Sequence, residues 1–206
     1  MGNRTNQSST LTGILSTNFS YLANDWLSVD GYDSNGNTTN STKGVDTYDY
    51  ENRLTVRTTG NTTIELLYDG DGNRVRKRVT VGTNVTTTWY VVDTKNLTGY
   101  AQVLEEHVKV NDGAVTLDRF YTVGLDLISQ TLDSQPSWYG YDGHGSVRFL
   151  TDSNGTVTDT YDYDAYGNLI ASTGTTSNRY RYTGEQWDED LEFYYLRARY
   201  SNPATG

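Results

Sequence analysis

The feature that most constrains this chain is a phrase that recurs along it. A Tyr-Asp pair is followed within a few residues by Gly or Asn, and then by a basic or aliphatic residue that opens another β-prone run. It reads GYDSNGNTT from Gly31, TYDYENRLTV from Thr47, LYDGDGNRVRKRV from Leu67, YGYDGHGSVRFL from Tyr139 and TYDYDAYGNLI from Thr160. Because a unit that cannot bury its own apolar face must stack on its copies, the phrase predicts an array of like units.

Each phrase has the chemistry of a β-hairpin. The Tyr ends a run rich in Val, Thr and aromatic residues, the Asp side chain can accept a backbone hydrogen bond from two residues further on, and the Gly tolerates a positive φ. We therefore predict an all-β fold of antiparallel hairpins in a twisted, spiralling sheet, with less than about a tenth of the residues in helices. The predicted repeat turns contain Asp33, Gly36, Asp69, Gly72, Asp142, Gly145, Asp164 and Gly167.

Charge narrows the possible partners. The 206 residues carry a formal net charge of −10, which disfavours nucleic acid and anionic membrane surfaces, and no apolar run is long enough for a membrane span. A local exception is the basic run Arg74, Arg76, Lys77 and Arg78, which we interpret as an edge-strand guard or a pairing partner for Asp-rich turns. The chain has no Cys, so stability must come from stacking and hydrogen bonds.

Motifs for catalysis and metal binding are weak. His107 and His144 are far apart and lack metal-ligand spacing. The loop 69–73 opens like a calcium loop, but Arg74 replaces the sharp-turn Gly and Thr80 replaces the bidentate Glu. We expect no metal and no cofactor.

Two further constellations have a structural and a functional interpretation. Asp162 and Asp164 are capable of acid–base work if they share one face of a strand, whereas turn capping is the simpler role. Four Trp residues either form a sugar-binding platform or belong to the core: Trp26, Trp89, Trp138 and Trp187. On this basis the chain is expected not to be an enzyme.

Nine Asn-x-Ser/Thr sequons are candidate N-glycosylation sites: Asn3, Asn6, Asn18, Asn37, Asn40, Asn61, Asn84, Asn96 and Asn154. The alternative is that Asn, Ser and Thr simply fill turns and outward strand positions. The first residues, MGNRTNQSST, lack the apolar centre of a secretory signal.

The stretches YGYDGHGSVRFLTDSNGTVTDTYDYDAYGNLIASTG and NRYRYTGEQWDEDLEFYYLRARYSNPATG resemble the RHS-repeat or YD-repeat family and its repeat-associated core domain. The resemblance divides the chain into an N-terminal strand segment (1–30), a candidate for exchange between subunits, degenerate YD repeats (31–138) and a core-like region (139–206). It implies a sheet that spirals into a hollow shell, as in bacterial polymorphic toxins, insecticidal toxin complexes and animal teneurins.

The family continues past its Tyr-Leu-Arg-Ala-Arg-Tyr signature into an aspartyl self-cleavage region. Here Ser201 and Asn202 precede Pro203 and that motif is missing, so no catalytic residue carries over. Two functions stay open: a non-catalytic wall portion of a shell that encloses toxin cargo, or a self-assembling extracellular filament or adhesin, with sugars on its sequons or glycans as partners. Either implies an extracellular or cell-surface location, and a homo-oligomer or the rest of a larger shell as partner.

Overall fold

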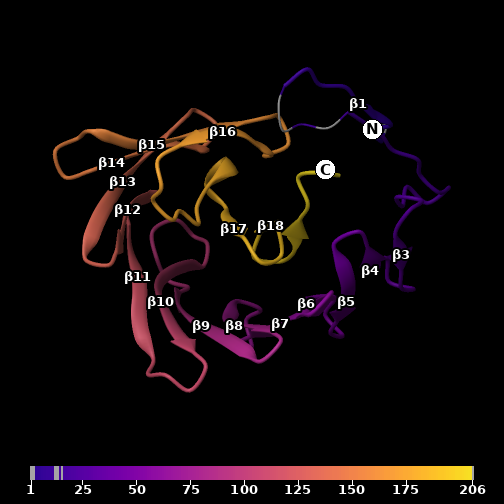
Figure 1. The fold of residues 1–206 in the computed structure, drawn as a ribbon, viewed down its shortest axis with the longest axis horizontal. Helices are drawn as coiled ribbons and strands as arrows, with labels where there is room; N and C mark the ends of the chain where they lie inside the picture. The colour runs from indigo at the N-terminus through magenta and orange to yellow at the C-terminus, as the bar shows by residue number, and fades with distance from the viewer. Residues whose placement is uncertain (1–2, 12–13, 15, 206) are drawn as a thin grey trace.

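A single meandering sheet dominates the computed structural model, which describes residues 3–11, 14 and 16–205. Strands hold 52% of the residues and helix 2%, so the predicted all-β fold class is confirmed. In the large sheet each strand pairs antiparallel with its neighbours in sequence, from β3 to β16. Figure 1 shows this sheet curving into an arc around the C-terminal strands.

The large sheet consists of β3 (Gly31–Tyr32), β4 (Thr38–Ser41), β5 (Gly44–Tyr48), β6 (Leu54–Thr59), β7 (Thr62–Tyr68), β8 (Arg74–Val81), β9 (Asn84–Asp93), β10 (Gln102–Val110), β11 (Thr116–Val123), β12 (Leu127–Leu132), β13 (Gln135–Tyr141), β14 (Val147–Thr151), β15 (Val157–Tyr163) and β16 (Leu169–Thr173). β1 (Asn6–Gln7) and β2 (Thr17–Asn18) pair with each other in a second sheet. A third sheet follows the short helix η1 (Tyr182–Gly184) in the chain and consists of β17 (Gln186–Asp188), β18 (Phe193–Tyr195) and β19 (Tyr200–Ser201). The boundary predicted after residue 138 falls inside β13.

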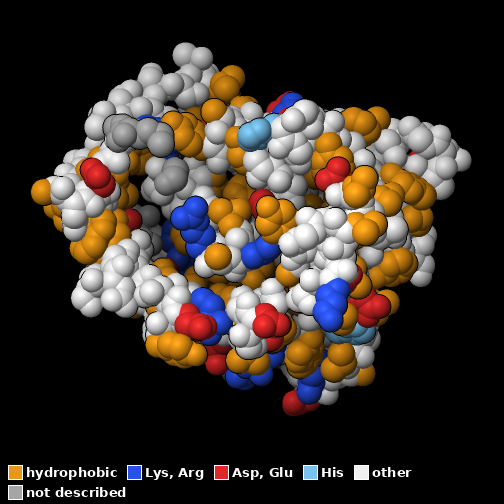
Figure 2. Space-filling model, turned by 180° about the vertical axis from the view of Figure 1, so that it is seen from behind, with side chains coloured by type: hydrophobic (Ala, Val, Ile, Leu, Met, Phe, Trp, Pro, Cys, Tyr) orange, Lys and Arg blue, Asp and Glu red, His pale blue; other side chains and the backbone are white. Residues whose placement is uncertain are grey.

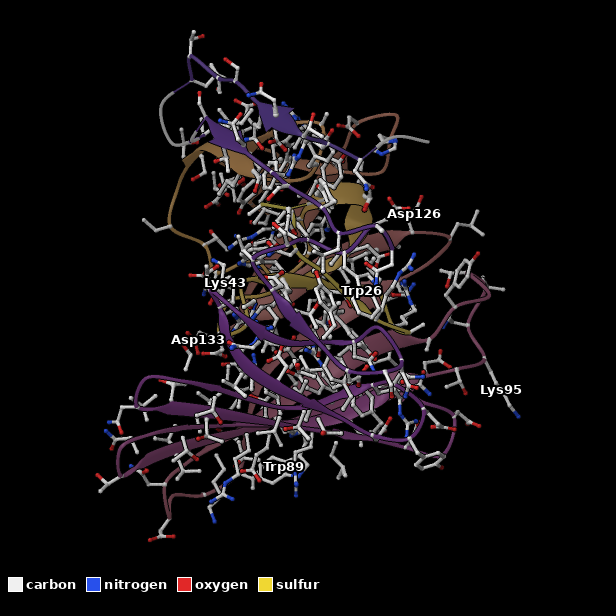
Figure 3. All side chains as sticks on the ribbon, turned by 90° about the vertical axis from the view of Figure 1, so that its right-hand side faces the viewer. Trp26, Lys43, Trp89, Lys95, Asp126 and Asp133 are labelled. Carbon is white, nitrogen blue, oxygen red and sulfur yellow. The ribbon has the colours of Figure 1, made fainter. Side chains whose placement is uncertain are left out.

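Side chains along each strand point alternately to the inner and the outer face of the sheet. In β9, Thr88 and Tyr90 are buried on the inner face, while the intervening Trp89 projects from the outer face of the sheet (Figure 3). Two apolar clusters occupy the inner face. The larger comprises Tyr90, Val103, Tyr121, Val147, Leu150, Tyr161 and Tyr180, and the smaller comprises Leu54, Ile64, Leu66 and Leu191.

The turn of the repeated phrase is built by its Asp. The Asp69 carboxylate Oδ1 accepts the backbone N–H of Asp71 at 3.0 Å and that of Asn73 at 2.8 Å, while Gly72 N–H donates to the Asp69 carbonyl at 3.1 Å. The same pattern recurs at the other phrase turns, whose Gly36, Gly145 and Gly167 have φ of 86°, 82° and 93°. A positive φ is inexpensive for Gly and strained for most other residues.

A β-bulge follows each of these turns. Tyr68 pairs with Arg74 but Leu67 pairs with Arg76, so one residue of β8 is left without a partner. The first residue of the strand and the residue three positions later therefore both face inward, as Arg74 and Lys77 do. The same spacing buries Leu54 with Arg57 and Val147 with Leu150.

The connections between strands form two chemically different rims. The connections that follow odd-numbered strands lie at one end of the large sheet. This end is called the Asp rim, because it holds all the Tyr-Asp phrase turns. The connections that follow even-numbered strands lie at the other end, called the opposite rim. Figure 3 shows the separation: Lys95 and Asp126 lie at the Asp rim, and Lys43 and Asp133 at the opposite one.

The N-terminal segment lies against the C-terminal end of the chain. The Arg4 guanidinium donates to the Ala204 carbonyl at 2.6 Å and stacks on Tyr166 at 4.1 Å. The Tyr21 hydroxyl donates to the Arg4 carbonyl at 3.0 Å. Of the segment 1–30 that is predicted to cross between subunits, residues 1, 2, 12, 13 and 15 lie outside the described residues, and exchange itself stays a prediction.

No helix among the described residues is both long and apolar enough to cross a membrane.

Candidate functional site: the inner face of the sheet

The concave face of the sheet is occupied by the C-terminal part of the chain. Residues 178–203, with η1 and β17–β19, lie within the arc in Figure 1. Three of their large side chains are almost fully buried there: Tyr180, Leu191 and Tyr194. The inner face is therefore a docking site for a segment of the same chain.

A buried ionic cluster joins this segment to β8. Arg74 Nη1 donates to Asp188 Oδ2 at 2.7 Å, and Lys77 Nζ donates to Asp188 Oδ1 at 2.8 Å. The Arg74 guanidinium lies 4.4 Å from the ring centres of both Tyr90 and Tyr195. Burial raises the pKa of the Asp188 carboxyl, but the charges of Lys77 and Arg74 outweigh it and hold that pKa at about 2.

The same cluster corrects one sequence-based interpretation. The basic run was expected either to guard an edge strand or to pair with Asp-rich turns. The first alternative is wrong, because β8 is a central strand. Arg74 and Lys77 are buried and bind Asp188, with Asp190 also accepting from Lys77 Nζ at 2.7 Å. Strict alternation of side chains along a strand would place residues 74 and 77 on opposite faces of the sheet. The bulge brings both to one face, so the alternation rule does not predict the cluster.

A second buried pair holds the next part of the segment. Arg57 donates from Nε to Asp46 Oδ1 at 2.7 Å and from Nη2 to Asp46 Oδ2 at 2.5 Å. Its Nη1 donates to the Leu191 carbonyl at 3.0 Å, and its guanidinium lies 4.2 Å from the centre of the Phe193 ring. The Arg57 guanidinium thus pairs with the Asp46 carboxylate and also donates a hydrogen bond to the backbone of the C-terminal segment.

The part of the inner face formed by β10–β12 carries a network of charged and neutral side chains. Tyr121 donates its hydroxyl to Glu106 Oε1 at 2.7 Å, and Arg119 Nη1 donates to the Ser177 carbonyl at 3.1 Å. Gln130 Nε2 donates to the same carbonyl at 2.9 Å. These contacts fix the chain where it leaves β16 and enters the arc.

A cavity of 690 Å³ remains between β3–β7 and the turn at residues 196–199. Its wall includes Arg53, Arg57 and Arg199 together with Tyr48 and Tyr68. Figure 2 shows this side of the molecule hollowed, with Lys and Arg side chains in the hollow. Burial and the charge of Asp46 raise the pKa of the Tyr48 hydroxyl to about 12, so it stays a neutral hydrogen-bonding group.

Asp162 and Asp164 do not form an acid–base pair, and the simpler expectation of turn capping is confirmed for Asp164. Asp162 is exposed and pairs with Arg148, while Asp164 lies in the β15–β16 turn and accepts the backbone N–H groups of Tyr166 and Asn168 at 2.8 and 2.9 Å. This geometry is turn capping. The carboxylate of Asp69 is likewise used by its own turn.

The remaining predicted residues are dispersed. The four Trp side chains are all half-buried: Trp26 stacks on Tyr32, and Trp187 packs edge-on against Tyr194, so they form neither a platform nor the centre of the core. His107 pairs with Glu105, and His144 lies near Tyr182. Among the described residues, no group of three or more His, Asp or Glu side chains is arranged to hold a metal ion.

The sequons divide by environment. Asn37 and Asn96 are half-buried and use their side-chain amides within their own turns. The exposed set is Asn3, Asn6, Asn18, Asn40, Asn61, Asn84 and Asn154. Of these, Asn61 and Asn154 lie in connections at the opposite rim and Asn84 begins the strand that follows one.

Sequence reasoning missed the buried carboxylates of the inner face, which are Asp46, Glu106, Asp159 and Asp188. For Asp188 the available signal was the acidic run Asp188–Asp190 between Trp187 and the aromatic residues from Phe193, which suits a segment that meets cations inside the fold.

Known proteins are similar to this chain in sequence and in fold. No protein-family profile matches the chain. A Bacillus spizizenii protein named tRNA3(Ser)-specific nuclease WapA is 39% identical over 181 residues, and the tRNA nuclease WapA of Bacillus subtilis strain 168 is 36% identical over 183 residues. Each match covers 85% of this chain and 7% of the relative. Salivary gland surface protein 1 of Aedes aegypti is 30% identical over 151 residues, 70% of this chain and 4% of that protein.

The solved structures show the fold. The crystal structure of TcdB2–TccC3 superposes with a TM-score of 0.70 at 19% identity, covering 93% of this chain and 11% of that chain. The Photorhabdus luminescens Tc holotoxin pore gives 0.72 at 18% identity, covering 93% and 10%. The chain thus has the fold of part of an RHS-type shell.

Proposed function

We propose that this chain is a non-catalytic wall portion of an RHS-type β-shell of the kind that encloses toxin cargo. The observation that carries the proposal is the unbroken 14-stranded meander, whose concave face is lined with cations that bind the C-terminal segment. Its overlap with about a tenth of each larger toxin chain supports a role as one portion of a wall.

Charge supports the non-catalytic part of the proposal. The relatives are named as nucleases for tRNA, a polyanion, whereas this chain carries a net charge of −10. The inner-face cations Arg57, Arg74 and Lys77 are neutralised by carboxylates rather than free for phosphate. A nuclease activity, where the relatives have one, is expected to reside outside the portion that this chain matches.

A chimera tests the wall role. The stretch of the Bacillus spizizenii relative that matches this chain is replaced by residues 1–206, and the particle is examined by electron microscopy and limited proteolysis. We expect an intact shell with a protease-resistant interior, whereas the same chimera carrying Asp188→Asn should be protease-sensitive. An open or aggregated particle with the unmodified insert overturns the proposal.

The catalytic question needs a separate assay. Purified chain is incubated with total tRNA over a wide range of protein concentration, beside a heat-denatured sample. We expect no cleavage above that control. Cleavage that rises with concentration and co-elutes with the chain contradicts a non-catalytic role.

One observation favours the filament as a second candidate. The end strands β3 and β16 each pair with a single neighbour among the described residues, which leaves a row of backbone N–H and C=O groups on each. Edge pairing between copies would extend the sheet, with the exposed sequons as positions for sugars and an extracellular setting. Electron microscopy of the purified chain separates the two: regular fibres favour the filament, and their absence at high concentration excludes it.

A further inference from the structure

Two neighbouring connections at the Asp rim lack the Tyr-Asp phrase and expose apolar side chains. They are residues 94–101 between β9 and β10, and residues 124–126 between β11 and β12. Leu97, Leu125 and Tyr100 are 81%, 79% and 67% exposed. Within the described chain only Tyr50 and Val29 share this degree of exposure among large hydrophobic residues. Apolar groups gathered in this way mark interaction sites.

Internal hydrogen bonds hold the longer connection in shape. Asn96 Nδ2 donates to the carbonyls of Asp93 and Tyr100 at 2.9 and 2.8 Å, and Gln102 Nε2 donates to Thr98 Oγ1 at 3.2 Å. The loop therefore presents Leu97 and Tyr100 from a fixed backbone, which lowers the entropy lost when a partner binds.

The two connections flank a cavity of 470 Å³, a volume typical of ligand pockets. Tyr100, Leu125 and Leu127 supply apolar wall, and Tyr141 and Tyr180 add aromatic faces. The carboxylates of Asp126, Asp142 and Glu185 also line it, against a single cation, Arg197.

The contacts of Arg197 show that the wall of this cavity can bind a cationic side chain. Its Nη1 donates to both Glu185 oxygens at 3.0 Å, its Nε donates to the Ala101 carbonyl at 3.1 Å, and its guanidinium lies 5.5 Å from the centre of the Tyr100 ring. That pair is neutral. The Asp142 carboxylate accepts the backbone N–H groups of its own turn, and no side-chain hydrogen bond or ion pair reaches Asp126 from any described residue. The cavity is left with net negative charge.

We propose that this cavity binds a short peptide segment of a partner protein in which a Lys or Arg side chain is flanked by apolar side chains. The cation pairs with Asp126, and the apolar neighbours cover Leu97, Tyr100 and Leu125. The proposal is independent of whether the chain forms a shell wall. A second copy of this acidic chain is a poorer occupant than a basic segment, because like charges repel.

Selection from a phage-displayed library of random heptapeptides on the immobilised intact chain tests the proposal. We expect enriched peptides with one Lys or Arg beside Leu, Ile or an aromatic residue. The most enriched peptide is then labelled with fluorescein and titrated by anisotropy. Asp126→Asn and Leu125→Ser should each weaken its binding by at least about fivefold, and added salt should weaken it further.

Matched substitutions control for charge and exposure. Asp133→Asn removes an exposed carboxylate at the opposite rim, and Tyr50→Ser removes a highly exposed aromatic ring that does not line this cavity. Both should keep the affinity within about twofold. Circular dichroism melts confirm that all four variants fold.

Three outcomes overturn the proposal. The first is that no peptide is enriched, or that the enriched peptides lack a basic residue. The second is equal binding by Asp126→Asn, Leu125→Ser and the intact chain. The third is that the intact chain self-associates and Leu97→Ser abolishes that association, which assigns the surface to a second copy.

Discussion

Replacing Asp188 by Asn tests whether buried charge holds the C-terminal segment inside the arc. The substitution keeps the side-chain shape but leaves Arg74 and Lys77 without the anion that they share at 2.7 and 2.8 Å. Breaking a buried ion pair by removing one partner typically costs about 3–5 kcal/mol, because the remaining charge stays buried. We expect a loss of that order in the free energy of unfolding at pH 7.

The pKa of Asp188 gives an independent magnitude. Its value of about 2 in the folded chain, against 3.8 ordinarily, corresponds to about 2 kcal/mol of stability at neutral pH. Because the folded pKa is depressed, this contribution is complete above about pH 4 and is lost as the pH falls toward 2. The substituted chain should lack this acid-dependent loss.

Urea unfolding followed by circular dichroism measures both effects. The control is Asp162→Asn, whose side chain is 59% exposed and pairs with Arg148, and which should cost less than about 1 kcal/mol. If Asp188→Asn costs no more than this control, or keeps the acid-dependent loss between pH 4 and 2, the ionic cluster does not hold the segment.

Three other predictions follow from glycines and sheet edges. Gly72→Asn should lower the free energy of unfolding by less than about 1 kcal/mol, and Gly72→Val should lower it clearly more. Gly167→Asn should cost more than Gly72→Asn, because a Cβ at 167 would lie 2.7 Å from a tyrosine ring carbon. Equal urea midpoints for these variants contradict the prediction. Gly140→Ala places a Cβ 2.2 Å from Phe149 Cζ and should cost about 1–3 kcal/mol, most of which Phe149→Ala removes in a double-mutant cycle; additive losses refute the contact. Light scattering should give the intact chain a mass above the monomer's 23.1 kDa, and deletion of residues 1–22 should lower it if that segment is exchanged; a monomer at high concentration ends the edge-pairing proposal.

The hairpins were predictable because each phrase contains its own turn chemistry. Asp69 and Gly72 are three residues apart, and the hydrogen bonds that close their turn span at most four residues. Local signals of this kind survive in any tertiary context. The alternation in EEHVKV, which lies within β10, is likewise a local pattern that favours a strand.

The inner face was not predictable in the same way. Arg74 and Asp188 are 114 residues apart in the chain, so no local pattern links them. The bulge after each turn also shifts the alternation, which places residues at a spacing of three on one face and defeats a strict two-residue pattern. The edge-guard interpretation of the basic strand is wrong because β8 is a central strand, whereas the alternative of pairing with Asp-rich turns agrees with the contacts of Arg74 and Lys77 to the acidic residues at 188–190.

The buried charges explain why the C-terminal segment adopts a single register. An apolar surface alone, such as the cluster around Leu54 and Leu191, tolerates small shifts of the packed strand. A shift of the segment by one residue would move Asp188 away from both Arg74 and Lys77, and would take the Leu191 carbonyl from Arg57. Each displaced contact would leave a buried charge or donor unpaired, at a cost that apolar repacking does not recover. The ionic contacts thus specify position, while the aromatic and aliphatic clusters supply the burial that keeps the segment inside the arc.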